Sequence, residues 1–233
     1  MTHISRGRIA LMWMFIGLPV GVPAPDPASP GVDANWWTAA TSQIAQQEYC
    51  ASRNEHGFQA PNRVQNLRTY FGDGGIDIVP REGGAGAKAG VWRVTWRTSE
   101  WGRAGNMAPV QAAEAGPRAE GARVTYAWSG LDEWYENKPE GLEQGFTVRE
   151  RRAGSGPLIV AGHFGGPGTR LRETDGNIDL LDESGARRLR YGALVARDAS
   201  GCELPAHLRV DGIDAAIMIV SGKNGVICFG PPK

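Results

Sequence analysis

The chain has 233 residues, of which 41% are hydrophobic and 21% charged, a balance typical of a globular protein rather than a disordered one. Its 25 Lys and Arg residues equal its 25 Asp and Glu residues, which argues against the basic surface that a nucleic-acid-binding protein needs. The 33 glycines and 15 prolines favour many short strands joined by tight turns.

The amino terminus has the pattern of an export signal. Two arginines precede an apolar run at 9–22, and small residues follow it. The alternative is a membrane anchor, which needs about 20 apolar residues, but this run is shorter and contains Pro19. We therefore expect residues 1–24 to be a signal peptide and residues 25–32 a Pro-rich linker. The mature protein is then secreted, extracellular or at the cell surface, with no stable membrane span.

Residues 33–53 predict an amino-terminal α-helix. Asp33 is a suitable cap, and apolar residues recur on one face at helical spacing. They are Trp36, Trp37, Ala40, Ile44, Ala45 and Tyr49. Such a stripe is usually a core face, so we expect this helix to pack against a sheet.

After residue 57 the apolar period changes to two, as in β-strands. Segments 67–71 and 76–79 flank a Gly-Asp-Gly-Gly sequence that predicts a hairpin. Further strands are expected at 91–101, 122–128, 133–137, 145–151, 158–161, 169–173, 177–181, 187–191, 194–197, 204–210 and 213–220. We therefore predict that 33–233 is one all-β domain, a two-sheet antiparallel β-sandwich of about a dozen strands.

Three separated blocks carry a family resemblance: QIAQQEYCASRNEHGFQAPNRVQNLRTYF at 43–71, LDEWYENKPEGLEQGFT at 131–147, and LDESGARRLRYGALVARDASGCELPAHL at 181–208. Together they resemble the amino-terminal module of secreted bacterial proteins that carry FG-GAP (integrin-like propeller) or related repeats. The resemblance implies a non-enzymatic structural or adhesive module. Its partner would be an extracellular protein or a polysaccharide.

Polar residues stand out within the matching blocks, namely Asn62, Asn66, Arg68, Tyr70, Glu143 and Gln144. Asn and Arg side chains satisfy backbone groups where irregular chain is buried, which favours a structural role for this set. Ligand binding is the alternative for the group at 62–70.

The chain departs from the family after residue 220. Members close the module with a YPLxIDP strand, whereas this chain continues as SGKNGVICFGPPK. The Asn-Gly pair favours a hairpin that adds a short strand at 226–229. Without that strand, the apolar segment 215–220 is expected to be an exposed sheet edge.

Aromatic residues suggest a second hypothesis, a carbohydrate-binding sandwich. The candidate binding residues are Trp92, Trp96, Trp134 and Tyr135, because exposed rings on a sheet can stack on sugars. The same rings can instead fill the core, which is the commoner use. Exposure of Trp92, Trp96 and Trp134 distinguishes the two interpretations.

A third hypothesis is a hydrolase, which needs carboxylates that converge on one cleft. The acidic residues of the central block are Asp132, Glu133, Glu136, Glu140 and Glu143. Most Asp and Glu residues are exposed, so strand edges and loops are the expected positions for this group.

The remaining reactive residues show no pattern of a metal or cofactor site. The four histidines and three cysteines lack the spacing of metal ligands, and we expect no metal, no cofactor and no catalytic residues. In an oxidising compartment one pair among Cys50, Cys202 and Cys228 can form a disulfide, and the spacing does not say which.

Overall fold

The structure is a computed structural model of the whole chain and describes residues 12–15, 47–81 and 92–219. Within these residues the chain folds as antiparallel β-sheets, which confirms the all-β prediction. The described part contains 19 strands in two large sheets and one small pair. The small pair joins β16 (Ala196–Arg197) to β17 (Glu203–Leu204).

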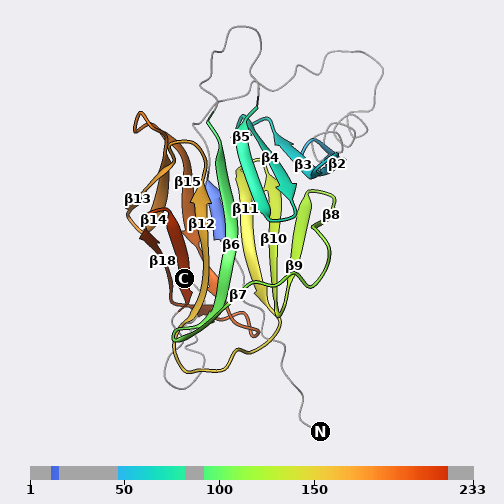
Figure 1. Cartoon of the computed structure of the whole chain (residues 1–233). Coiled ribbons are helices and arrows are strands. Elements are labelled where there is room, and N and C mark those ends of the chain that lie inside the picture. The colour runs from blue at the N-terminus through green and yellow to red at the C-terminus, as the bar shows by residue number, and fades with distance from the viewer. Residues whose placement is uncertain (1–11, 16–46, 82–91, 220–233) are drawn as a thin grey trace, which may run out of the picture.

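The first large sheet, sheet A, has eight strands. Their order is β13 (Arg170–Thr174), β14 (Asn177–Leu181), β15 (Arg187–Leu194), β1 (Met12–Phe15), β11 (Gly141–Val148), β10 (Leu131–Lys138), β9 (Arg123–Trp128) and β8 (Arg118–Glu120). β1 pairs antiparallel with both β11 and β15. Those two flanking strands therefore run parallel to each other, with β1 between them (Figure 1).

The second large sheet, sheet B, has nine strands. Their order is β18 (Ala206–Asp211), β19 (Asp214–Ile219), β12 (Leu158–Gly165), β6 (Val94–Arg103), β5 (Gly75–Pro80), β4 (Leu67–Gly72), β3 (Gly57–Asn62) and β2 (Ser52–Asn54), and β7 (Asn106–Pro109) pairs with β6. In Figure 1, β6 and β12 lie in front of β1 and β11.

Side chains of the two sheets meet in one aromatic core. The Trp96 ring of β6 lies 4.7 Å from Phe164 of β12 and 5.9 Å from Tyr191 of β15, between ring centroids. Phe71 of β4 contacts Tyr135 of β10 edge to face, at 5.6 Å. Large rings dominate because each buries a large apolar area.

The hairpin predicted at 67–79 is confirmed, and the strands expected at 169–173 and 177–181 also pair as a hairpin. β4 and β5 pair from Leu67↔Pro80 to Gly72↔Gly75, which leaves a two-residue turn. β13 and β14 turn at Asp175 and Gly176, whose φ angles of 50° and 74° suit the left-handed region that this type of turn requires. Gly adopts this region freely and Asp is among the few other residues enriched there, so the local sequence favours the turn.

Three expectations about the elements are changed by the structure. Most of the expected helix at 33–53 lies outside the described residues, but its end is wrong, because Ser52–Asn54 forms β2 and pairs with β3. The backbone turns there since the Asn54 side chain accepts a hydrogen bond from the His56 amide, at 3.0 Å. The count of about a dozen strands was too low, mainly because short strands such as β7, β8, β16 and β17 lack a periodic pattern.

The expected apolar edge at 215–220 is also wrong. β19 lies between β18 and β12, so its backbone is paired on both sides. The edge strand is β18, which exposes His207, Arg209 and Asp211. Charged residues on an edge strand oppose edge-to-edge association. The alternative strand at 226–229 lies outside the described residues.

Candidate functional site

The four aromatic residues considered for sugar binding mostly lie in the interior. Trp96, Trp134 and Tyr135 are 1%, 5% and 0% exposed, and Trp92 is half-buried. Trp134 lies under the Arg123 guanidinium, whose central carbon is 3.8 Å from the ring centroid. A ring enclosed in this way offers no face to a sugar, so this placement favours the packing interpretation for these three residues.

A buried carboxylate, Glu133 of β10, lies at the centre of the aromatic core. Its side chain is 1% exposed and lies between the two sheets. Glu133 Oε1 accepts hydrogen bonds from Tyr135 OH at 2.5 Å, Gln144 Nε2 at 2.7 Å and Trp96 Nε1 at 3.1 Å. Oε2 accepts one from Trp128 Nε1 at 3.0 Å. Among the described residues, no Lys or Arg forms an ion pair with this carboxylate.

The hydrogen-bond network around Glu133 extends to β11 and β15, the two strands that flank β1. Gln144 of β11 donates from Nε2 to Tyr135 OH at 2.9 Å, and its Oε1 accepts from Tyr191 OH at 2.7 Å. Tyr191 belongs to β15, so this contact joins the two strands that flank β1. Burial, and then the Glu133 charge, raise the pKa of Tyr135 and Tyr191 well above 10.0. Both tyrosines therefore stay protonated as hydrogen-bond donors.

Sequence reasoning placed Glu133 at an exposed position, which is wrong. The available signal was the period-two pattern, since Leu131, Glu133 and Tyr135 share one strand face. A carboxylate among neutral donors in a core is costly to bury, and each of its bonds must therefore be formed. The arrangement holds several strands in register, and it gives Glu133 no access to a substrate.

Two carboxylates of the hydrolase hypothesis are neighbours across β10 and β11. Glu136 and Glu143 are directly paired in register. Lys138 Nζ lies 2.5 Å from Glu143 Oε2 and 3.8 Å from Glu136 Oε2. Glu143 is only 2% exposed. The Lys138 charge thus compensates the pair, and the inner carboxylate is not accessible from solvent.

Asn62, at the end of β3, ties sheet B to sheet A. Its Nδ2 donates to Asn137 Oδ1 at 2.9 Å and to the Lys138 carbonyl at 2.7 Å, and its Oδ1 accepts from the Gln65 amide at 3.0 Å. The neighbouring Asn66 has φ 52°, and its carbonyl accepts from the Arg81 amide at 2.9 Å. These contacts support a structural use of both asparagines.

Arg68 and Tyr70 have a different environment from the two asparagines. Together with Val79, Pro80 and Arg81 they line a cavity of about 340 Å³. No hydrogen bond or ion pair joins Arg68 to another side chain of the described residues. Two guanidinium groups beside a tyrosine ring form a surface that suits an anionic group.

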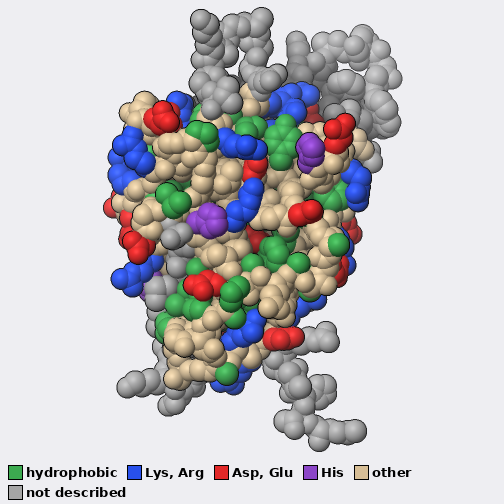
Figure 2. All heavy atoms as spheres, in the orientation of Figure 1, with side chains coloured by type: hydrophobic (Ala, Val, Ile, Leu, Met, Phe, Trp, Pro, Cys, Tyr) green, Lys and Arg blue, Asp and Glu red, His purple; other side chains and the backbone are tan. Residues whose placement is uncertain are grey.

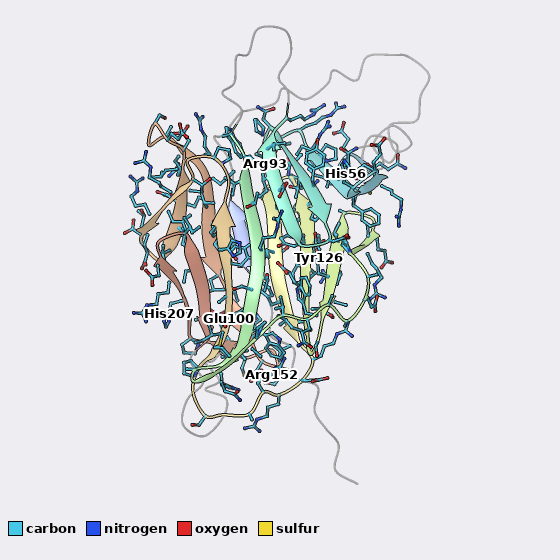
Figure 3. The ribbon with its side chains drawn as sticks, in the orientation of Figure 1. His56, Arg93, Glu100, Tyr126, Arg152 and His207 are labelled. Atoms are coloured by element: carbon cyan, nitrogen blue, oxygen red, sulfur yellow. The ribbon has the colours of Figure 1, made fainter. Side chains whose placement is uncertain are left out.

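The described part of the chain contains no group of His, Cys, Asp and Glu suited to hold a metal ion. Figure 3 shows His56 and His207 at opposite sides of the molecule. Asp179, next to the β13–β14 turn, is 1% exposed, and Arg190 and Arg172 lie 2.8 and 3.1 Å from it. Hydrogen bonds from Arg190 lower the pKa of Asp179. The carboxylate is thus held by arginines rather than available to a cation.

Cys202, between β16 and β17, takes part in a disulfide. Cys50 is half-buried just before β2, and Cys228 lies outside the described residues. A bridged cysteine is typical of an oxidising compartment.

No helix in the described part of the chain has the length and apolarity needed to cross a bilayer. Comparisons with models of protein families, with curated proteins and with solved structures gave no match.

Proposed function

We propose that this chain is an exported, non-catalytic β-sandwich module that serves as a structural or adhesive part of an extracellular repeat protein. The contacts between side chains of sheets A and B support the sandwich arrangement. The apolar run at 9–22 behind two arginines supports export. The resemblance over 43–71, 131–147 and 181–208 supports the association with repeats.

The observation that carries the proposal is that the buried carboxylates bind other side chains of the fold. Glu133 is bonded to neutral donors, Glu143 to Lys138, and Asp179 to arginines. A general acid or base must reach a substrate at hydrogen-bond distance. These three carboxylates contact other parts of the fold instead, as expected of a scaffold.

The adhesive contact, in this proposal, is the cavity lined by Arg68, Tyr70 and Arg81. The ligand class is an acidic polysaccharide, because a carboxylate can bind the guanidinium groups while the sugar ring packs on Tyr70. On the face in view, Figure 2 shows several separate groups of hydrophobic side chains among charged and polar ones.

Binding of acidic and neutral polysaccharides to the purified protein tests this proposal. We expect uronic-acid polymers to bind in a salt-dependent manner and neutral ones not to bind. The double variant Arg68→Ala/Arg81→Ala should lose this binding, while Arg209→Ala, an exposed arginine on the distant edge strand β18, should keep it. Equal binding by both variants would contradict the assignment, and turnover of any polymer would contradict the non-catalytic role.

The two alternatives have weaker support. The carbohydrate-binding sandwich with tryptophan contacts retains only the half-buried Trp92 as an accessible ring among the four proposed residues. The hydrolase hypothesis is supported only by the adjacent carboxylates Glu136 and Glu143, and Glu143 is buried beneath Lys138. Both therefore rank below the structural or adhesive module.

A further inference from the structure

β1 occupies a central position in sheet A although it belongs to the expected export signal. Its four residues pair with Gly141–Gln144 of β11 on one side. On the other side Met12 pairs with Leu194 and Trp13 with Gly192, with a register shift between them. The flanking strands have eight residues each, so β1 covers only part of their length.

The space that β1 fills is maintained by other parts of the fold. β11 and β15 are held two strand spacings apart, about 10 Å, and the Tyr191–Gln144 hydrogen bond of 2.7 Å joins them through the core. Gln144 is fixed in turn by Glu133 and Tyr135. All four of these side chains are 2% exposed or less. We call the space between β11 and β15 the slot. Buried side chains thus connect its two flanking strands without any contribution from β1.

The slot also has a defined strand direction. β11 and β15 run parallel to each other, so one inserted strand can be antiparallel to both, as β1 is. An empty slot would leave backbone groups of two central strands unpaired, and buried backbone groups need partners. Main-chain pairing on two sides, with apolar side chains, is the recognition mode of an added β-strand.

We propose that the slot between β11 and β15 is a strand-acceptor site, which β1 fills as a displaceable plug and which, once β1 is gone, binds an extended apolar segment of another polypeptide. The chemistry of the ligand follows from the segment seated there, Met-Trp-Met-Phe within an apolar run. Natural removal of β1 rests on the proposed export, but the experiments below do not.

The first test uses the full chain with Trp13→Pro, because proline cannot donate to the ladder and is excluded from central strands. The probe is a fluorescent peptide of residues 9–17 with lysines added for solubility. The control peptide differs only by proline in place of Trp13. Fluorescence anisotropy measures binding, and hydrogen exchange measures protection of the β11 and β15 amides.

We expect the Trp13→Pro protein to bind the probe peptide one to one and at least tenfold more tightly than the control peptide. The wild-type chain should bind neither, because its own β1 competes at a high effective concentration. Exchange at β11 and β15 should be faster in the variant and should slow again when the peptide is added. Exchange at β4 and β5 should not change.

Three results would overturn the proposal. Without peptide, the β11 and β15 amides of the variant can exchange as slowly as in the wild-type chain. The slot would then be closed or filled by residues 226–229. The variant can bind both peptides equally, which indicates unspecific apolar adhesion. It can form a dimer that the peptide does not dissociate, which assigns the slot to a second copy.

A second form of the protein covers the case in which Trp13→Pro does not fold. Residues 25–30 are replaced by a specific protease site, and the folded chain is cut there. We expect segment 1–24 to stay bound after cutting and to be exchanged for the labelled peptide. Release of the segment with unchanged amide protection and no uptake of peptide would contradict the acceptor site.

Discussion

Asn62 lies where β3 ends, and its side chain amide reaches the backbone of β10 in the other sheet. We expect Asn62→Ala to lower the free energy of unfolding by about 2 kcal/mol, because it leaves the Lys138 carbonyl and the Gln65 amide without their partner in a buried region. Urea unfolding measures this loss.

Arg68→Ala is the matched control for that experiment. The sequence favoured a structural role for Arg68 as well, but its side chain lines a cavity and makes no ion pair with the described residues. Its replacement should change stability by no more than about 0.5 kcal/mol. A large loss in Arg68→Ala, with none in Asn62→Ala, would reverse the roles assigned to the two residues.

The buried tyrosines predict alkaline unfolding. Burial, and then Glu133, raise the folded-state pKa of Tyr135 and Tyr191 well above 10.0, the value expected when they are unfolded. Below pH 10 both states are protonated, and above it only the unfolded state loses protons, so stability falls as pH rises. Each such tyrosine adds a slope of about 1.4 kcal/mol per pH unit.

Urea unfolding between pH 8 and pH 11 measures that slope, and tyrosinate absorbance shows when the rings ionise. Tyr191→Phe should remove the contribution of one tyrosine to this slope above pH 10, about 1.4 kcal/mol per pH unit. Ionisation of buried tyrosines near pH 10 while the protein is still folded would contradict the described burial.

At the scale of elements, β11 depends on a glycine beneath a tryptophan. A Cβ atom on Gly145 would lie 2.1 Å from Cζ2 of Trp134, which cannot move away freely because Arg123 covers its ring. We expect Gly145→Ala to destabilise the fold by roughly 1–3 kcal/mol through overpacking. Thermal unfolding and tryptophan fluorescence measure this effect.

Gly72→Ala provides the comparison, since a Cβ there would meet its nearest neighbour, the His56 carbonyl oxygen, at 3.8 Å. Its effect should be small. Equal melting temperatures for both variants would show that Trp134 has another position available.

Elements with local partners were predictable from the sequence. The β4–β5 and β13–β14 hairpins follow from turn residues and a period-two pattern, because both depend on neighbours in the chain. The pairing of β12 with β6 and of β1 with β11 joins distant segments. No local pattern encodes which distant strands pair, so the strands were predictable from the sequence but their order in the sheets was not.

The polar core was not predictable for the same reason. Glu133 acquires its partners only when β6, β9, β10 and β11 are placed in register. Its alternation with Leu131 and Tyr135 shows that it faces inward, but the sequence contains no sign of the two indole donors. The cavity at Arg68 and Arg81 likewise depends on the pairing of β4 with β5.

At the scale of the whole molecule, export can be tested directly. The apolar run at 9–22 and the Pro-rich residues behind it lead us to expect a mature protein that begins near Pro25. Mass spectrometry of material from the culture medium of an exporting host measures the amino terminus. Secreted protein that retains Met1 would contradict removal of the signal, and the slot would then open to another strand only when β1 is displaced.

The position of β1 also has a consequence for the timing of folding. β1 is made before both of its neighbours, β11 and β15, which come from the later part of the chain. Sheet A therefore cannot be completed until most of the polypeptide has left the ribosome, and pairings between such distant segments form slowly. Under the proposed export, the amino terminus is withheld from the sheet for as long as the export machinery holds it. The proposed export therefore predicts that sheet A stays incomplete until the amino terminus is released or removed.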